Sequence, residues 1–355
     1  MAEILIKNGR IWNGKNFFCG DILTSGNVIA KIAKSIPSEA DFILDADRKI
    51  VTAGLVDLHV HMRGIAPPEF GIQAEMSCFP FGVTAANDAG AVQGNRALLD
   101  SFMLKNTVFV SVGIQDNHAD LTQAAARLAV YGDKAVGLKV YFDETVSDVR
   151  DISPLREVCS FAHTKGLPVM VHCSNSPVSM EDILNTLDAG DILTHAFHGG
   201  KNNAAEDGFE NMRKAQKRGV IIDAGLAGHV HTDFSIFRQG IENGILPDVI
   251  STDITACSAY TRGGRYGMTM CMSIAKELGM CEKEILKAVT SNPAGILGKE
   301  NEWGFLKESG PADMAVLAYK DEGFDLTDKA GNHIKSHNGY RCVLTVSDGQ
   351  IVYKH

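Results

Sequence analysis

The stretch GLVDLHVH, residues 54–61, decides the fold and points to the chemistry of this chain. It is an apolar, strand-like run that ends in two histidines. Side chains along a strand alternate between its two faces, so His59 and His61 share one face and Val60 lies on the other. If the apolar face packs against helices, both imidazoles point to the same place near the carboxyl end of the strand. Two imidazoles so placed can hold one divalent cation.

Seven further apolar runs follow along the chain, separated by segments with a helical pattern. They are GVTAAND (82–88), TVFVSVG (107–113), KAVGLKVYF (134–142), LPVMVHC (167–173), DILTHAF (191–197), GVIIDAG (219–225) and PDVISTD (247–253). Buried parallel strands read as continuous apolar runs, and eight β/α units over roughly 250 residues are typical of a closed (β/α)8 barrel. An open doubly wound sheet is the alternative. The barrel is favoured because the reactive residues fall at strand ends, where barrel active sites lie.

Both ends of the chain read as short strands and tight turns. Near the N-terminus, Asn8-Gly9 and Asn13-Gly14 interrupt apolar runs in the pattern of a β-hairpin. Asp348-Gly349 marks a similar turn close to the C-terminus. The predicted α/β chain therefore has two parts, a small composite β-sandwich domain from residues 1–50 and 305–355 and a TIM barrel over residues 51–304.

The composition is that of an ordinary globular protein. Of the 355 residues, 45% are hydrophobic and 22% are charged, and the net charge is −9. The acidic balance argues against a nucleic-acid partner, and no apolar run reaches the ~18 residues of a membrane span. None of the eight cysteines forms a C-x-x-C pair, so they read as reduced thiols. We predict a cytoplasmic protein that acts on a small molecule and binds neither nucleic acid nor membrane.

Four more strand-end residues extend the candidate metal site. They are Lys139, His172, His195 and Asp253. An ammonium group is costly to bury in an apolar strand, so Lys139 either extends its head to solvent or is a neutral amine that has added carbon dioxide. The resulting carbamate is an anionic oxygen ligand able to bridge two cations. A lone histidine is more often structural, and Asp253 can be a helix cap, but the set together favours a metal site.

Other polar residues near the strand ends are candidates for contact with substrate. His198 lies three residues after His195, and Arg63 can clamp a carboxylate bidentately or form a structural ion pair. Asn175 and Arg262, the latter in the glycine-rich loop TRGGRYG, are further candidates. A second H-x-H, His229 and His231, follows the seventh run. It has no matching partners, so we predict a surface or substrate-loop role for it rather than metal binding.

This set of residues resembles the amidohydrolase superfamily, in its subtype with two metals and a carboxylated bridging lysine. The match in residue type, order and strand placement covers about residues 1–350. The resemblance implies two divalent cations, taken as zinc, a metal-bridging hydroxide as nucleophile, and a homo-oligomer. It assigns the ligands as follows: His59, His61 and Asp253 for the first cation, His172 and His195 for the second, and the carbamate of Lys139 between them. Asp253 would also be the catalytic residue that moves a proton from the water to the leaving group.

Two branches of that superfamily compete for this chain. Arg63 completes H-x-H-x-R, which is similar to dihydroorotases and other cyclic amidases, where the arginine holds a substrate carboxylate. Those enzymes carry Asp-His after strand eight, whereas this chain has Ile254 after Asp253. ILTHAFHGGKNN and ISTDIT look more like the group labelled as deacetylases. We predict hydrolysis of an acetyl amide or ester of a small carboxylate-bearing substrate, with a cyclic amidase (dihydroorotase or hydantoinase) as the alternative. A purine deaminase is disfavoured by Lys139, and a non-catalytic relative by the complete ligand set.

Overall fold

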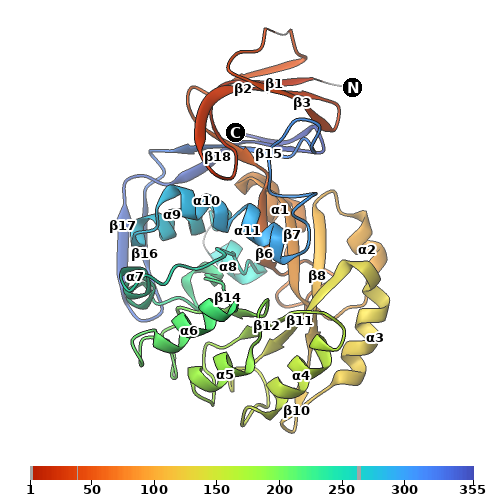
Figure 1. The fold of residues 1–355 in the computed structure, drawn as a ribbon, viewed down its shortest axis with the longest axis vertical. Coiled ribbons are helices and arrows are strands. Elements are labelled where there is room, and N and C mark those ends of the chain that lie inside the picture. Colours follow the sequence, from red (N-terminus) through yellow and green to blue (C-terminus); the bar gives the residue numbers. More distant parts are fainter. Residues whose placement is uncertain (1–2, 38, 262–264) are drawn as a thin grey trace.

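A parallel sheet of seven strands forms the centre of the protein (Figure 1). The computed structural model describes residues 3–37, 39–261 and 265–355. The strands of this sheet are β6 (Leu55–Val60), β7 (Val83–Ala91), β8 (Lys105–Val112), β11 (Ala135–Tyr141), β12 (Val169–His172), β13 (Ile192–Thr194) and β14 (Ile221–Ile222). They pair in chain order with no reversal, so the doubly wound alternative is wrong. The predicted α/β class is confirmed.

The predicted eighth strand is present only as an irregular segment. Val249 forms an isolated parallel bridge with Asp223 on one side, and Ile254 forms one with Val60 on the other. Asp253, whose backbone N–H donates to the carbonyl of residue 59, has a φ of 46°. A left-handed residue interrupts the pleat of a regular strand, which is why no continuous ladder forms here. The segment nevertheless lies between the two edge strands of the sheet.

Helices pack around the central sheet, as Figure 1 shows. They are α1 (Ala74–Cys78), α2 (Arg96–Ser101), α3 (Leu121–Tyr131), α4 (Ser153–His163), α5 (Met180–Thr186), α6 (Glu210–Arg218), α7 (Phe234–Glu242), α8 (Ala256–Thr261), α9 (Met268–Leu278), α10 (Glu282–Ala288) and α11 (Ser291–Ile296). Short 3-10 turns span Phe79–Phe81, Gly132–Lys134 and Ala227–His229. Val56 and Leu58 of β6 share a buried apolar cluster with Ala294 of α11, the helix-facing role expected for that side of the strand. No helix in the described ranges is long and apolar enough to cross a membrane.

The two ends of the chain build one further sheet of eight strands, at the top of Figure 1. Its strands are β1 (Ile4–Trp12), β2 (Phe17–Ser25), β3 (Val28–Ala33), β4 (Phe42–Asp45), β5 (Ile50–Ala53), β15 (Met314–Tyr319), β18 (Tyr340–Ser347) and β19 (Gln350–Lys354). Apolar side chains of both terminal segments share one buried cluster, which includes Ile6, Val51 and Val316. The sheet therefore ties the N-terminal and C-terminal segments together and places β5 directly before β6.

The turn predicted at Asn8-Gly9 is wrong, whereas those at Asn13 and Asp348 fall between paired strands. β1 runs straight through Asn8, and its register with β2 shifts between Ile6 and Gly9. Asn8 has a φ of 55°, so the Asn-Gly pair forms a β-bulge instead of a hairpin loop. Bulges and tight turns share the same residue preference, which is why the sequence did not separate them.

Two small hairpins lie outside both large sheets. One pairs β9 (Ile114–Gln115) with β10 (His118–Ala119), and the other pairs β16 (Phe324–Thr327) with β17 (His333–Ser336). The second leaves the terminal sheet after β15 and lies beside α7 (Figure 1). The carboxylate of Asp328, in its loop, accepts a hydrogen bond of 2.7 Å from the backbone N–H of Phe234 at the start of α7. The hairpin tip is thus held against the loop that follows β14.

Candidate metal centre

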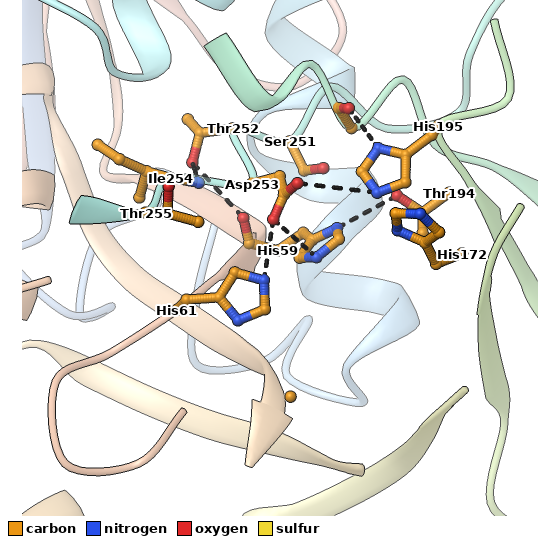
Figure 2. A network of polar contacts seen from close by, with 12 residues as sticks. His59, His61, His172, Thr194, His195, Ser251, Thr252, Asp253, Ile254 and Thr255 are labelled. Atoms are coloured by element: carbon orange, nitrogen blue, oxygen red, sulfur yellow. Dashed lines mark hydrogen bonds and ion pairs between the residues drawn. The ribbon is translucent and has the colours of Figure 1, made fainter. Parts of the chain in front are cut away.

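The carboxyl ends of the central strands bring the predicted ligands into one buried group. Figure 2 shows the four histidines and Asp253 of this group. The six are His59 in β6, His61 directly after it, Lys139 in β11, His172 at the end of β12, His195 directly after β13, and Asp253 in the irregular segment. Parallel strands present their carboxyl ends at the same edge of a sheet, so residues far apart in sequence meet there. The four histidines lie at or next to strand ends, as predicted, whereas Lys139 lies within β11 and Asp253 lies in a segment that forms only isolated bridges.

His59, His61 and Asp253 form the first cluster. The Oδ1 atom of Asp253 lies 3.1 Å from Nε2 of His59 and 2.9 Å from Nε2 of His61. One ligand atom from each residue lies within 4.8 Å of the others, a spacing that can hold a metal ion. Burial would raise the pKa of the Asp253 carboxyl, but the adjacent imidazoles of His59, His61 and His195 lower that pKa well below its ordinary value.

The hydrogen bonds of His59 leave its Nε2 atom without a proton. The Thr194 hydroxyl donates its single proton to Oδ2 of Asp223 at 2.7 Å, because a carboxylate oxygen accepts. Thr194 must therefore accept from Nδ1–H of His59, which lies 3.2 Å away. The neutral imidazole then has its lone pair on Nε2, the atom that faces Asp253. Nε2 of His59 and Oδ1 of Asp253 are then two acceptors 3.1 Å apart, and Nζ of Lys139, 3.2 Å from the same Nε2 atom, is a donor beside them.

His195 follows the same rule on the next strand. Its Nδ1 atom lies 2.6 Å from the carbonyl oxygen of Gly225, which can only accept, so Nδ1 carries the proton. Its Nε2 lone pair is buried, lacks a hydrogen bond within the described residues, and lies 3.7 Å from Oδ2 of Asp253. Such an orphaned acceptor is unfavourable unless a cation or donor fills the gap.

His172 is oriented by a hydroxyl as well. The Ser174 hydroxyl donates to Oδ2 of Asp143 at 2.8 Å and so accepts from Nε2–H of His172, also at 2.8 Å. This leaves Nδ1 of His172 as its unprotonated nitrogen. Histidines that bind metals commonly donate their other N–H to such a partner, which fixes the tautomer and the ring.

The electrostatics of the cluster suit a cation. Burial lowers the pKa of His59 to about 4, and it lowers the pKa values of His172 and His195 as well. The imidazoles are therefore neutral near pH 7, which is the form that binds metal. Neutral nitrogen lone pairs and one carboxylate, all buried, are the donor set preferred by zinc and similar ions. The residues present fit a divalent metal.

Lys139 is fully buried beside the first cluster. Its Nζ atom lies 3.2 Å from Nε2 of His59 and 3.4 Å from Sδ of Met170. Burial lowers the pKa of the Lys139 amine to about 8. The side chain does not reach solvent, so the alternative in which its head extends to the surface is wrong. A buried amine with a lowered pKa has more of the neutral form that can react with carbon dioxide.

His231 corrects the interpretation of the second H-x-H motif. Its ring centroid lies 4.5 Å from that of His195 and 4.9 Å from that of His172. One ligand atom from each of these three histidines lies within 4.8 Å of the others, so they can hold a metal together. Burial lowers the pKa of His231 to about 4. The H-x-H spacing marked His231 as a possible metal ligand. However, His231 lies in a loop outside any regular strand, so the direction of its side chain was not predictable.

A layer of carboxylates and hydroxyls behind the cluster was missed by the sequence reasoning. Asp57 accepts hydrogen bonds from the Thr252 hydroxyl at 2.6 Å and from the Thr252 and His59 backbone N–H groups. Burial raises the pKa of Asp57 to about 7. These contacts connect β6 to the segment that carries Asp253. The only signal in the sequence was the polar residue two positions before His59.

The predicted substrate contacts fall into three kinds. Arg63 is exposed and forms no ion pair with the described residues, so a structural ion pair is not its role there. The amide of Asn175 donates to Oδ2 of Asp143 at 3.2 Å, and His198 is buried close by. Asn175 and His198 both line a cavity of about 300 Å³ together with His231. Arg262 lies outside the described residues.

A third group of possible ligands lies elsewhere, at Cys159, His163 and Asp191. Asp191 already accepts backbone N–H bonds from Val169 at 2.8 Å and Asp188 at 2.9 Å, and it pairs with His163 at 3.0 Å. Burial raises the pKa of the Cys159 thiol to about 12, which disfavours the thiolate that a metal needs. This group is explained by its structural hydrogen bonds.

Comparison with known proteins places this geometry in context. Residues 50–352 match the model of the amidohydrolase family. The chain is 27% identical to a protein named deacetylase from Enterococcus faecalis over 98% of both chains. Among solved structures it resembles an adenine deaminase (TM-score 0.87, 25% identity, all of both chains). It also resembles the fold of a dihydroorotase (TM-score 0.87, 24% identity, all of this chain and 98% of that one).

Proposed function

Because this chain belongs to the amidohydrolase family and is a hydrolytic enzyme, we propose that it cleaves an acetyl amide or ester of a small, carboxylate-bearing substrate. The observation that carries the proposal is the meeting of two unprotonated imidazole nitrogens, from His59 and His195, on the carboxylate of Asp253. Enzymes of this family act on small molecules and generally use metal ions. The similarity to a deacetylase over nearly the whole chain supports an acyl bond as the target.

Two divalent cations, taken as zinc, complete the proposed centre. The first has His59, His61 and Asp253 as its ligands, and the second has His172 and His195, with His231 within reach. A carbamate on Lys139 would supply a bridging oxygen ligand, and the buried amine next to His59 supports that role. Bound zinc ions polarise a carbonyl and make water acidic enough to lose a proton near neutral pH.

Asp253 is the proposed catalytic residue. Its carboxylate is kept ionised by the surrounding histidines, and an ionised carboxylate can take the proton of an attacking water. The same oxygen can then return that proton to the leaving amine or alcohol. The hydrogen bond from its own backbone N–H to the carbonyl of His59 (2.7 Å) keeps the side chain over the cluster.

Arg63, Asn175 and His198 are the proposed substrate contacts among the described residues, and Arg262 is a fourth candidate. The exposed guanidinium of Arg63 has no ion pair in the described ranges and is available to a carboxylate. Arg63 and the likeness to a dihydroorotase fold favour the second candidate, ring opening of a cyclic amide. Ile254, in place of the histidine that cyclic amidases carry, favours the acyl hydrolase.

The experiment is a comparison of substrates with zinc-loaded enzyme. N- and O-acetylated carboxylic acids are tested beside dihydroorotate and hydantoin, with Asp253→Asn as the control for contaminating activity. Turnover of acetyl compounds that is absent from the control supports the proposal. Turnover of the cyclic amides alone would replace it with the second candidate, and metal-loaded enzyme that hydrolyses neither class contradicts both.

Three wider expectations accompany this proposal. The bridges from residues 249 and 254 to the two edge strands support an eight-membered TIM barrel over residues 51–304. The shared terminal sheet supports a separate small β domain from residues 1–50 and 305–355, although β5 runs on to Ala53 and the β16–β17 hairpin packs on α7. A cytoplasmic homo-oligomer remains a prediction, which fractionation and light scattering would test.

A further inference from the structure

The cavity beside the metal centre has one wall that comes from the C-terminal part of the chain. Asn175, His198 and His231, from the loops after β12, β13 and β14, line it together with Lys329 from the tip of the β16–β17 hairpin. We propose that this cavity binds the carboxylate of the substrate and that Lys329 is the residue that selects an anionic substrate. The inference rests on the proposed function and names the part of the site that recognises the acid.

His198 lines this cavity and has an imidazole N–H without an acceptor in the described part of the chain. The backbone N–H of Gly200 donates to Nδ1 of His198 at 3.2 Å, so Nδ1 holds the lone pair and the proton is on Nε2. Nε2 is buried and has no partner in the described part of the chain. Burial lowers the pKa of this imidazole to about 4, so it stays neutral. A buried N–H without an acceptor is unusual in a folded protein, and this one belongs to a residue of the cavity wall.

Lys329 is the cation of the cavity wall that has no ion pair within the described ranges. Lys201, which follows Gly200 of the same wall, is paired with Glu144 at 2.6 Å. Asp233 places a carboxylate in the same wall; its Oδ1 atom accepts the N–H groups that cap α7 and the amide of Asn332, and no ion pair joins it to Lys329 in the described ranges. The positive charge of Lys329 is therefore available to an incoming anion.

The hairpin tip is held in place by a set of hydrogen bonds. The buried carboxylate of Asp328 accepts from the backbone N–H of Phe234 at 2.7 Å, from the backbone N–H of Asn332 at 2.8 Å and from the side-chain amide of Asn332 at 2.9 Å. Asn332 also donates to Asp233 at 3.0 Å. These bonds fix the residue next to Lys329 to the loop that carries His231. A lysine whose backbone is fixed loses less freedom on binding than one on a free loop.

Arg63 is the other cation that could bind the substrate carboxylate. The two assignments, to Lys329 or to Arg63, lead to different predictions. Arg63 follows β6, on the side of the first cluster, whereas Lys329 and His198 lie on the side of His172 and His231. If the cavity binds the acid, the acyl group has to lie between the cavity and Asp253. Replacing Lys329 then affects only substrates that carry a negative charge.

The test compares an acid with its uncharged carboxamide, using the acetylated acid that wild-type enzyme turns over best. Lys329→Met is expected to raise KM for the acid about 10-fold, leave its kcat within about 2-fold, and leave KM for the carboxamide unchanged. Lys329→Arg should restore most of the loss. Lys335→Met is the matched control, since Lys335 is an exposed lysine of the same hairpin that is paired with Asp325 at 3.4 Å. Equal effects on acid and carboxamide, or a charge-selective effect of Arg63→Met instead, would overturn the proposal.

A binding measurement keeps the inference testable if no acetyl compound is hydrolysed and the proposed function fails. Calorimetric titration of the zinc-loaded protein with N-acetylalanine and with N-acetylalaninamide reads the charge preference directly. Tighter binding of the acid that disappears in Lys329→Met supports the subsite. Absence of acid binding, or its persistence in that variant, refutes it.

Discussion

Replacing Thr194 by valine tests the hydrogen bonds that orient His59. The hydroxyl of Thr194 donates to Asp223 at 2.7 Å and accepts from Nδ1–H of His59 at 3.2 Å. Valine keeps the branched shape and removes both bonds, which leaves an imidazole N–H without an acceptor and a buried carboxylate with one donor fewer. The Asp223 carboxylate keeps the hydrogen bond from the Ser251 hydroxyl at 2.8 Å, so it loses only one of its two hydroxyl donors.

The magnitude follows from these contacts. A buried hydrogen bond to a charged group contributes about 1.5–3 kcal/mol, so Thr194→Val should lower the free energy of unfolding of the metal-free protein by about 2 kcal/mol. Loss of the partner that orients a ligating histidine typically reduces metal affinity about 10- to 100-fold. Thr194→Ser keeps the hydroxyl and loses one buried methyl group, which costs about 1 kcal/mol of stability without changing the tautomer.

Two measurements separate these effects. Urea unfolding of metal-free protein reports the fold, and competition with a fluorescent zinc chelator reports affinity. We expect Thr194→Val to bind zinc at least 10-fold more weakly than Thr194→Ser. Equal affinities in the two variants would mean that Thr194 does not set the protonation of His59, and the assignment of a lone pair to Nε2 would have to be abandoned.

Three other predictions test separate parts of the site. Asp253→Asn should keep most of its metal, measured by mass spectrometry, but lose about 10²- to 10⁴-fold in kcat, and near-normal turnover would exclude proton transfer by this residue. Lys139→Ala should lose the bridging ligand and hold fewer metal ions per chain, and a carbamate signal from ¹³C-labelled carbon dioxide should vanish with it; full occupancy in that variant would remove Lys139 from the site. With a thiol reagent at pH 8 the exposed cysteines Cys19, Cys257 and Cys281 should react quickly and the five buried ones slowly, and rapid reaction of all eight would contradict the fold.

The positions of the candidate ligands were predictable from the sequence because they depend on local rules. A strand has a period of two, and the carboxyl ends of parallel strands meet, so a histidine at the end of a short apolar run has a known destination. That argument placed His59, His172 and His195 without any knowledge of their neighbours. It also predicted the order of the central strands.

What the sequence could not show depends on irregular backbone. Asp253 and His195 have φ values of 46° and 58°, and neither left-handed residue is a glycine. Asp253 interrupts the eighth apolar run, and Asn8 converts an expected turn into a bulge. His231 lies in a loop with no periodicity, so its H-x-H spacing could not show that its ring meets those of His172 and His195. In each case the outcome depends on the local backbone conformation, which tertiary packing determines.

The hydroxyl groups behind the site act across strands, and this has a consequence for substitutions. Thr194 is adjacent to His195 in sequence, yet its hydroxyl orients His59 of another strand. Thr252 is adjacent to Asp253 and binds Asp57, two residues before His59. Residues next to one ligand thus support the ligand of a different strand. A change at Thr194 should therefore reduce the affinity of the first cluster, which contains His59, for its cation. The affinity of the second cluster, which contains the neighbouring His195, should fall less. The reverse order of loss, measured by stepwise metal titration of Thr194→Val, would show that sequence proximity governs these ligands instead.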